Sequence, residues 1–245
     1  MSENESKSID LLGLKPFGKG IEIATKGLIE GATAFLGRIC LPAAEELGLL
    51  FRDRVNYWRA IQASKIAEKA ERKLKSQPEN EHVHAHPRLV GMAIEYGSWV
   101  DADEVQEMWA GLLASSCTKD GKDESNLMFM NLLAQLTTSQ ARMLSYGCEK
   151  SPKRLGSSGL IINPPGVYVT MAELVSIAGI DDVNRLDREL DHLRTLGLLS
   201  IGIFNNPQGP MIGDLAPTSL GLQMYVRCQG YTGPPGNYFG LTKAE

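Results

Sequence analysis

Residues 101–117, DADEVQEMWAGLLASSC, decide how the middle of this chain folds. Apolar side chains recur in this stretch at intervals of three or four residues: Val105, Met108, Trp109, Leu112 and Leu113. That spacing places them on one face of an amphipathic helix. Asp101 precedes the apolar positions, and Glu104 follows it three residues later, which is the spacing of a capping box. We therefore predict a helix that Asp101 caps and that buries Trp109.

Helical patterns continue on both sides of this stretch. Pro87 stands at the first position of a segment reading PRLVGMAIEYGSW, where a proline starts a helix well. After the central helix, SNLMFMNLLAQL predicts another helix, and Thr137 with Gln140 forms a second capping-box pattern before ARMLSYGC. Residues 87–148 are therefore predicted to form one compact helical bundle.

The same residues resemble the Abi-alpha family, whose name stands for abortive infection alpha. The resemblance rests on PRLVGMAIEYGSWV, then DADEVQEMWAGLLASSC, then FMNLLAQLTTSQARML. The family pattern, a WAxLLA-like core followed by LxxLoxxxAxxL with o a small hydroxyl residue, falls on Trp109, Ala110, Leu112, Leu113, Ala114, Leu133, Leu136, Thr137, Ala141 and Leu144. The late LAPTSLG, residues 215–221, also fits, so the resemblance covers nearly the whole chain. It implies a bacterial or phage-related protein of antiviral defence, with no catalytic residues to carry over.

The first part of the chain reads as an amphipathic helix over residues 16–41. Ile21, Leu28 and Phe35 recur every seven residues on its apolar face. Beside that face runs a stripe of small residues: Gly20, Ala24, Gly27, Gly31 and Ala34. Small residues at this spacing let another helix approach closely. We therefore expect the stripe to pack within the protein or within its oligomer.

From Pro42 to about Ser76, we expect one long helix that only Gly48 interrupts, with Trp58 on its apolar face. Residues 52–75 carry eight Lys or Arg against three acids, which predicts a basic, solvated second half. The expected organisation is a disordered start (1–15), an amphipathic helix with a long basic helix (16–76), a histidine-containing linker (77–86), the bundle (87–148), a linker (149–166), a module (167–230) and an irregular tail (231–245).

The module at residues 167–230 combines helices with a hairpin. Thr170 and Glu173 predict the start of a short helix, and a longer helix over residues 182–196 is expected to stop at Gly197. Two strands separated by a turn follow, and Thr218 caps a closing helix. The order helix, helix, hairpin, helix is typical of a winged-helix-like module. The predicted fold is therefore mainly α, with a small C-terminal winged-helix-like α+β module.

The charges of this module argue against DNA binding. Its second helix should carry the residues that read DNA, yet residues 181–194 hold five acids against three arginines. Residues 195–226, which include the expected wing, contain no Lys or Arg. Phosphates would be repelled from such a surface. We therefore expect the module to bind protein, and a DNA-binding regulator remains only an alternative.

Three of the four histidines lie at alternate positions in EHVHAHP, residues 81–87. In a strand, His82, His84 and His86 would share one side and could converge on zinc or nickel. However, no neighbouring apolar run fixes a strand here, and no second shell can be identified. We interpret the segment as a linker and expect neither a metal nor another cofactor, with these histidines as a weak metal candidate.

The sequence contains no GxSxG, P-loop or HExxH pattern, so we expect no enzymatic activity. Its four cysteines form no CxxC pair, which predicts buried, reduced thiols in a cytoplasmic protein: Cys40, Cys117, Cys148 and Cys228. Net charge is −4 with a pI near 5.7, and no apolar run approaches the length of a membrane span. A soluble protein is therefore expected.

These observations together predict a non-enzymatic antiviral-defence protein that binds a protein partner or assembles into a homo-oligomer. The alternative is a membrane-perturbing effector that makes peripheral contact through the N-terminal amphipathic helix. The residues expected to carry interaction and packing are Gly20, Ala24, Gly27, Gly31, Phe35, Trp58, Trp109, Leu112, Leu113 and Leu136.

Overall fold

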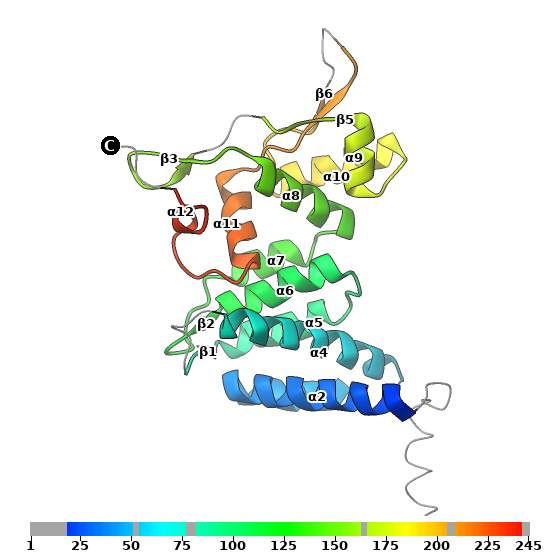
Figure 1. The fold of residues 1–245 in the computed structure, drawn as a ribbon, viewed down its shortest axis with the longest axis vertical. Coiled ribbons are helices and arrows are strands. Elements are labelled where there is room, and N and C mark those ends of the chain that lie inside the picture. Colours follow the sequence, from blue (N-terminus) through cyan, green and yellow to red (C-terminus); the bar gives the residue numbers. More distant parts are fainter. Residues whose placement is uncertain (1–18, 51–53, 77–81, 163–165, 205–208, 242–245) are drawn as a thin grey trace, which may run out of the picture. The chain divides into compact units, whose positions relative to one another are not determined.

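The computed structural model describes residues 19–50, 54–76, 82–162, 166–204 and 209–241 (Figure 1). The chain divides into two compact units, Met1–Met130 and Asn131–Glu245. Helices dominate both units in the described ranges, and the strands are only two or three residues long. The prediction of a mainly α fold is therefore confirmed. The start that is expected to be disordered, residues 1–15, lies outside the described residues.

In its described part, the first unit contains five complete helices and a two-stranded ribbon. They are α2 (Lys19–Ile39), α3 (Leu41–Leu49), α4 (Arg54–Lys75), α5 (Pro87–Gly97), α6 (Asp103–Ser115), β1 (His84–Ala85) and β2 (Cys117–Thr118). A further helix, α7 (Leu127–Leu133), crosses the boundary between the units. Helix α4 packs against both α2 and α6, as Figure 1 shows. Its position makes α4 the central helix of this unit.

The core of the first unit is centred on α6. Trp109 is 1% exposed, and the apolar face predicted around it is buried throughout: Val105, Met108, Leu112 and Leu113. The predicted burial of Trp109 is therefore confirmed. Burial extends beyond one face, because the small residues Ala110 and Ala114 are also covered. Helix α6 is thus enclosed by its neighbours and is not a surface helix.

The expected long helix from Pro42 to Ser76 is wrong. The structure has two helices instead, and α3 ends at Leu49, directly after Gly48. Glycine has a low helix propensity, which favours an end at this position. The expectation of a basic, solvated second half is wrong for Lys69, which α4 buries together with Ala60, Ala63, Ile66, Ala67, Ala70 and Leu74, whereas Arg72 and Lys75 are exposed. This helix lies between two others, so most of its surface is covered.

The second unit contains helices and three small antiparallel pairings. They are α8 (Thr138–Lys150), β3 (Arg154–Leu155), β4 (Ile161–Ile162), β5 (Tyr168–Thr170), α9 (Met171–Ala178), α10 (Val183–Thr195), β6 (Ile203–Phe204), β7 (Ile212–Asp214), α11 (Ser219–Cys228) and α12 (Pro235–Tyr238). Strand β7 lies between β5 and β6. The order α9, α10, β6–β7 hairpin, α11 is the predicted one, with β5 added to the sheet. Its likeness to a winged helix stays a prediction.

Most of the expected helix signals are confirmed. Thr137 with Gln140 and Thr170 with Glu173 form complete capping boxes. The Thr218 side chain caps α11. The expected cap of α6 is wrong, because Ala102 occupies the N-cap position without a side-chain hydrogen bond. The helix begins two residues after Asp101, and Asp103 makes a tertiary contact instead.

Three segments expected to be irregular contain regular structure. In the expected histidine linker, His84–Ala85 pairs with Cys117–Thr118, while residues 77–81 lie outside the described residues. The linker expected at 149–166 contains the β3–β4 pair. The expected irregular tail contains α12, in which Gly236 is buried. The bundle expected at 87–148 contributes α5 and α6 to the first unit and α8 to the second.

Candidate interaction site

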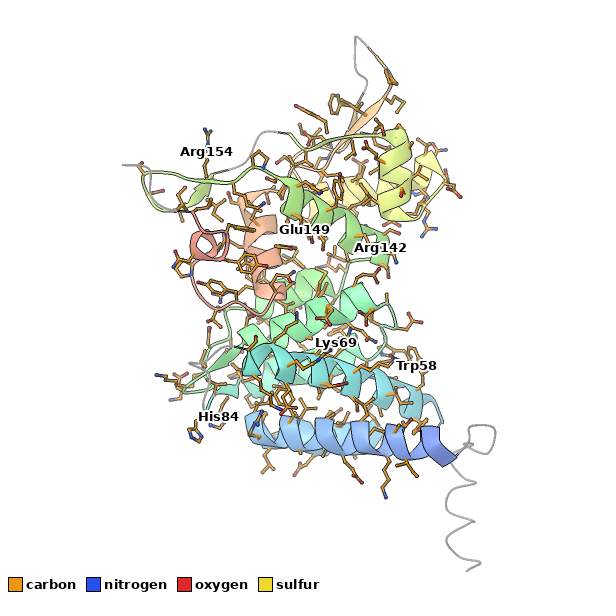
Figure 2. The ribbon with its side chains drawn as sticks, in the orientation of Figure 1. Trp58, Lys69, His84, Arg142, Glu149 and Arg154 are labelled. Carbon is orange, nitrogen blue, oxygen red and sulfur yellow. The ribbon has the colours of Figure 1, made fainter. Side chains whose placement is uncertain are left out.

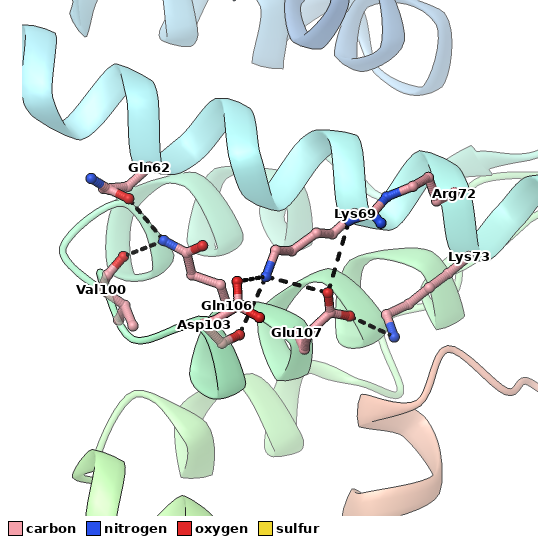
Figure 3. Close-up of polar contacts among 8 residues, drawn as sticks. All are labelled: Gln62, Lys69, Arg72, Lys73, Val100, Asp103, Gln106 and Glu107. Carbon is pink, nitrogen blue, oxygen red and sulfur yellow. Dashed lines mark hydrogen bonds and ion pairs between the residues drawn. The ribbon is translucent and has the colours of Figure 1, made fainter. Parts of the chain in front are cut away.

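An ion cluster joins α4 to α6 within the first unit (Figure 3). The Lys69 side chain is only 8% exposed, and its Nζ lies 2.5 Å from Asp103 Oδ1 and 3.2 Å from Glu107 Oε1. Lys73 Nζ contacts the other oxygen of Glu107 at 2.9 Å. A buried ammonium group needs such partners, because leaving it unpaired costs several kcal/mol. The cluster therefore fixes the register of the two helices.

A neutral hydrogen-bond network continues this contact toward the beginning of α4. Gln106 Nε2 donates to Gln62 Oε1 at 2.8 Å and to the Val100 carbonyl at 2.9 Å (Figure 3). Both glutamines are buried. Paired buried amides cost little, whereas an unpaired one would destabilise the fold. One polar seam thus joins α4 to the first turns of α6.

The lysines of the cluster change the acidity of its two carboxylates. The hydrogen bond and charge of Lys69 hold the pKa of Asp103 below its ordinary value of 3.8. Partial burial acts to raise the pKa of Glu107, but the hydrogen bonds and charges of Lys73 and Lys69 outweigh it, so its pKa lies below 4.5. Groups with depressed folded-state pKa values stabilise the fold above those values.

We expect Lys69→Met to destabilise the protein more at pH 7 than at pH 3. The two pKa values are lower in the folded state, so the stability that they reflect is present above 3.8 and 4.5 and is lost as pH falls through the lowered values. Urea unfolding of both proteins at the two pH values measures the difference. Lys75→Met is the matched control, since Lys75 is exposed and pairs with Glu71 on its own helix. The prediction would be contradicted if the difference in free energy of unfolding between the two proteins were the same at both pH values.

An exposed aromatic cluster lies on α4 and the end of α5. Trp58 is 38% exposed, Tyr96 49% and Trp99 54%. The rings of Trp58 and Trp99 lie 6.5 Å apart at 45°, and Tyr96 stacks on the buried Trp109 at 6.5 Å. Figure 2 shows Trp58 near the beginning of α4, on the same helix as Lys69. These aromatic rings therefore rest on the core of the unit while part of their surface faces outward.

Arg59 holds this aromatic cluster in place. Its guanidinium carbon lies 4.5 Å from the Trp99 ring centroid, a cation–π contact. The same group donates to Ser98 Oγ at 3.0 Å and pairs with Glu95 Oε2 at 3.0 Å. The Arg59 side chain is largely covered, so its position is fixed by several bonds. We call Trp58, Arg59, Tyr96 and Trp99 the aromatic patch.

The small-residue stripe does not pack against the described part of the first unit. Ala24, Gly27, Gly31 and Ala34 are exposed, and a Cβ at Gly27 or Gly31 would meet nothing within 4 Å. The surroundings of Gly20 lie outside what the structure describes. By contrast, Phe35 and Ile39 are buried. Packing of these four residues is therefore not seen among the described residues, and packing of the stripe between copies stays a prediction.

Helix α10 carries charges that are partly paired with one another. Arg185 Nε lies 3.6 Å from Glu189 Oε1, and Arg194 Nη2 lies 2.7 Å from Asp191 Oδ1. Asp182 caps the helix, and Asp181 and Asp187 are exposed. Two of the three arginines thus have acidic partners on the same helix. This surface retains its net negative charge.

The histidines of the first unit take structural roles. His86 is the N-cap of α5, where its Nδ1 accepts a hydrogen bond from the Arg88 amide. His84 lies in β1, and His82 has a φ of 61°. Within the described ranges, no group of three or more His, Cys, Asp or Glu residues is placed to hold a metal. The structure thus does not bring His82, His84 and His86 together.

The four cysteines are all free and buried. Burial raises the pKa of the Cys117 thiol to about 12. A thiol with so high a pKa is not a nucleophile at neutral pH. The prediction of buried, reduced thiols is therefore confirmed.

The sequence pattern of the family described as abortive infection alpha matches residues 59–215. The chain belongs to this family. No curated protein and no solved structure matches the chain. The family match begins at Arg59 in the aromatic patch and ends at Leu215, after β7. It includes the α4–α6 ion cluster, the stretch 87–148 on which the resemblance rests and parts of both units, but not the nearly whole chain that was expected.

In this abortive infection alpha protein, the predicted interaction residues have different environments. Trp109, Leu112 and Leu113 form the core, Leu136 is half-buried, and Trp58 belongs to the aromatic patch. Sequence reasoning missed four residues of the first unit: Arg59, Lys69, Tyr96 and Trp99. One signal could have identified Lys69. One helix face carries Gln62, Lys69 and Lys73. Two acids and a glutamine at matching spacing could pair with it: Asp103, Glu107 and Gln106.

The described helices of the abortive infection alpha protein include none that is long and apolar enough to cross a membrane.

Proposed function

We propose that this abortive infection alpha protein acts in antiviral defence by binding a protein partner or another copy of itself, and that it catalyses no reaction of its own. The aromatic patch is the observation that carries this proposal. Tryptophan, tyrosine and arginine are the residues most enriched among those that dominate binding energy. Here they lie together and are partly exposed.

The rigidity of the patch supports a binding role. Arg59 is bonded to Ser98 and Glu95 before any partner arrives, and Tyr96 rests on the buried Trp109. A surface that is already ordered loses less conformational entropy on binding. The patch is therefore suited to contact with a folded protein surface.

Two alternatives receive less support. A membrane-perturbing helix would have to expose its apolar side chains, but Ala32, Phe35, Leu36 and Ile39 of α2 are already buried in the unit. Its insertion would require α2 to leave α4. A DNA-binding regulator would need a basic reading helix, whereas residues 181–194 hold five acids against three arginines, and the arginines at positions 185 and 194 are already paired.

A phage challenge of bacteria that express this chain alone tests the proposal. Protection at a low phage-to-cell ratio with collapse of the culture at a high ratio is the expected result, because abortive infection sacrifices the infected cell. Light scattering of the purified protein, as a separate measurement, tests self-association. Absence of protection at both ratios would contradict a role for this chain as a sufficient effector.

We expect Trp99→Ala to abolish phage protection while folding stability falls by at most about 1 kcal/mol, the size of one cation–π contact. Truncating a central binding residue costs about 2 kcal/mol or more of binding free energy. Leu41→Ala is the matched control, because Leu41 is a strongly exposed apolar residue on α3 of the same unit. Full protection by the Trp99 variant would argue against the patch as the binding surface. Trp99→Phe should restore part of the activity.

A further inference from the structure

The C-terminal segment of the second unit is held by aromatic contacts. After α11 the chain turns at Gly230, whose φ of 90° favours glycine, and then forms α12. The Phe239 ring stacks on Tyr225 with centroids 6.4 Å apart and planes at 9°. Tyr238 meets the same Tyr225 ring edge-on at 6.4 Å. We call residues 231–241 the tail, and α11 supplies the ring on which it rests.

The rest of the tail contact comes from the end of α8 and from β3. Lys153 Nζ lies 4.6 Å from the Phe239 ring centroid. Gly236 is buried so closely that an added Cβ would lie 2.8 Å from Leu155 Cδ2. We call Glu149, Lys153, Leu155 and Tyr225 the tail-docking surface. Figure 2 labels Glu149 on α8.

Bonds that involve no tail atom order the docking surface. The Tyr225 hydroxyl donates to Glu149 Oε1 at 3.3 Å. Lys153 Nζ donates to the Ser151 carbonyl at 2.7 Å and to the Glu149 carbonyl at 3.3 Å. With the tail in place, burial raises the pKa of Tyr225 and desolvation lowers that of Lys153. The three hydrogen bonds involve no tail atom, so they can order these side chains before a tail binds.

The tail, in contrast, has little structure of its own. Helix α12 is four residues long, far below the length at which an isolated helix is stable. Six residues, 229–234, connect it to α11, and among them are Gly230, Gly233 and Pro234. The tail therefore behaves as a short peptide ligand, with Gly236, Tyr238 and Phe239 as its contact residues, tethered by a short hinge.

We propose that the tail-docking surface also accepts the tail of a second copy of this chain, so that two copies exchange tails and assemble. The exchange makes the same contacts as the closed form, and identical contacts make such swapping a low-cost route to a dimer. This inference rests on the self-assembly proposed above and names a surface for it.

Mixing two full-length variants tests the exchange directly. One carries Leu155→Cys and the other Gly236→Cys, and both are incubated with oxidised glutathione. A disulfide needs Cβ atoms about 3.5–4.5 Å apart. A covalent heterodimer therefore forms when the tail of one copy lies on the docking surface of the other. The buried native thiols contribute little, since burial raises the pKa of Cys148 and Cys117.

Asn237→Cys in place of Gly236→Cys is the matched control, because Asn237 is the adjacent tail residue and is exposed. Adding Tyr238→Ala and Phe239→Ala to the tail variant should remove the covalent heterodimer. Equal cross-linking through position 237 would show random collision and overturn the proposal. A third variant carries both Leu155→Cys and Gly236→Cys in one chain. Disulfides that form only within single chains of this variant would also overturn the proposal.

The two proposals can fail separately. If no heterodimer forms, but light scattering shows that the unmodified protein associates and that Trp99→Ala prevents this, tail exchange is overturned and the aromatic patch stands. If the heterodimer forms and Trp99→Ala leaves phage protection intact, assembly through the tail stands and the patch loses its role.

Discussion

Replacement of Trp109 by alanine is expected to lower the free energy of unfolding by about 3–5 kcal/mol, the usual cost of removing a large buried aromatic side chain. Trp109 is 1% exposed at the centre of α6. It stacks on Tyr96, and a Cβ at Gly97 would come within 3.3 Å of its ring. Surroundings packed this tightly cannot collapse far into the cavity. Urea unfolding followed by circular dichroism measures the loss.

The control for this variant is Trp99→Ala, which removes the same side chain from a position that is 54% exposed. Its cost should be smaller, because about half of its surface stays in water on folding. The two variants therefore separate burial from residue type. Equal unfolding midpoints for the Trp109 variant and the parent protein would contradict the placement of Trp109 in the core.

The correct sequence predictions concern interactions that are local along the chain. Thr137 with Gln140 and Thr170 with Glu173 are three residues apart, so the capping bonds need nothing beyond one helical turn. The burial of α6 was predictable for a related reason, since an apolar stripe at helical spacing must be covered somewhere. Both kinds of signal are complete within one segment of the sequence.

The predictions that were wrong depend on partners far along the chain. Asp101 was the predicted cap of α6, but the helix begins at Asp103, which binds Lys69, 34 residues earlier. Lys69 itself was counted among solvated charges, yet it is buried because α4 lies between α2 and α6. The tail reads as irregular by composition, and its order comes from Tyr225 and Lys153. Sequence alone does not say which segments meet.

Glycine shows the same limit most clearly. The small-residue stripe from Gly20 to Ala34 suggested close helix packing, but its described members are exposed. The close approaches occur elsewhere in the chain. A Cβ at Gly147 in α8 would collide with the Leu215 carbonyl, and one at Gly221 in α11 would collide with the Leu198 carbonyl. Neither glycine belongs to a recognisable stripe.

Gly147→Ala is therefore expected to destabilise the protein by about 1–3 kcal/mol, the usual cost of overpacking. The Leu215 backbone cannot easily move away. Its amide donates to the Val167 carbonyl at 2.9 Å, and the adjacent Ala216 amide donates to the buried Asp214 carboxylate at 2.9 Å. Helix propensity alone predicts the opposite sign, since alanine is favoured over glycine by about 1 kcal/mol inside a helix. Chemical unfolding of the variant decides between the two.

Gly27→Ala is the matched control, because Gly27 also lies inside a helix but a Cβ there would meet nothing within 4 Å. Propensity acts alone at this position, so stability should rise by up to about 1 kcal/mol. Opposite signs for one chemical change would show that tertiary contact decides the outcome. A stabilised Gly147 variant would mean that α8 and the Leu215 backbone are not in contact. If Gly27→Ala instead weakens self-association, the exposed stripe packs against another copy.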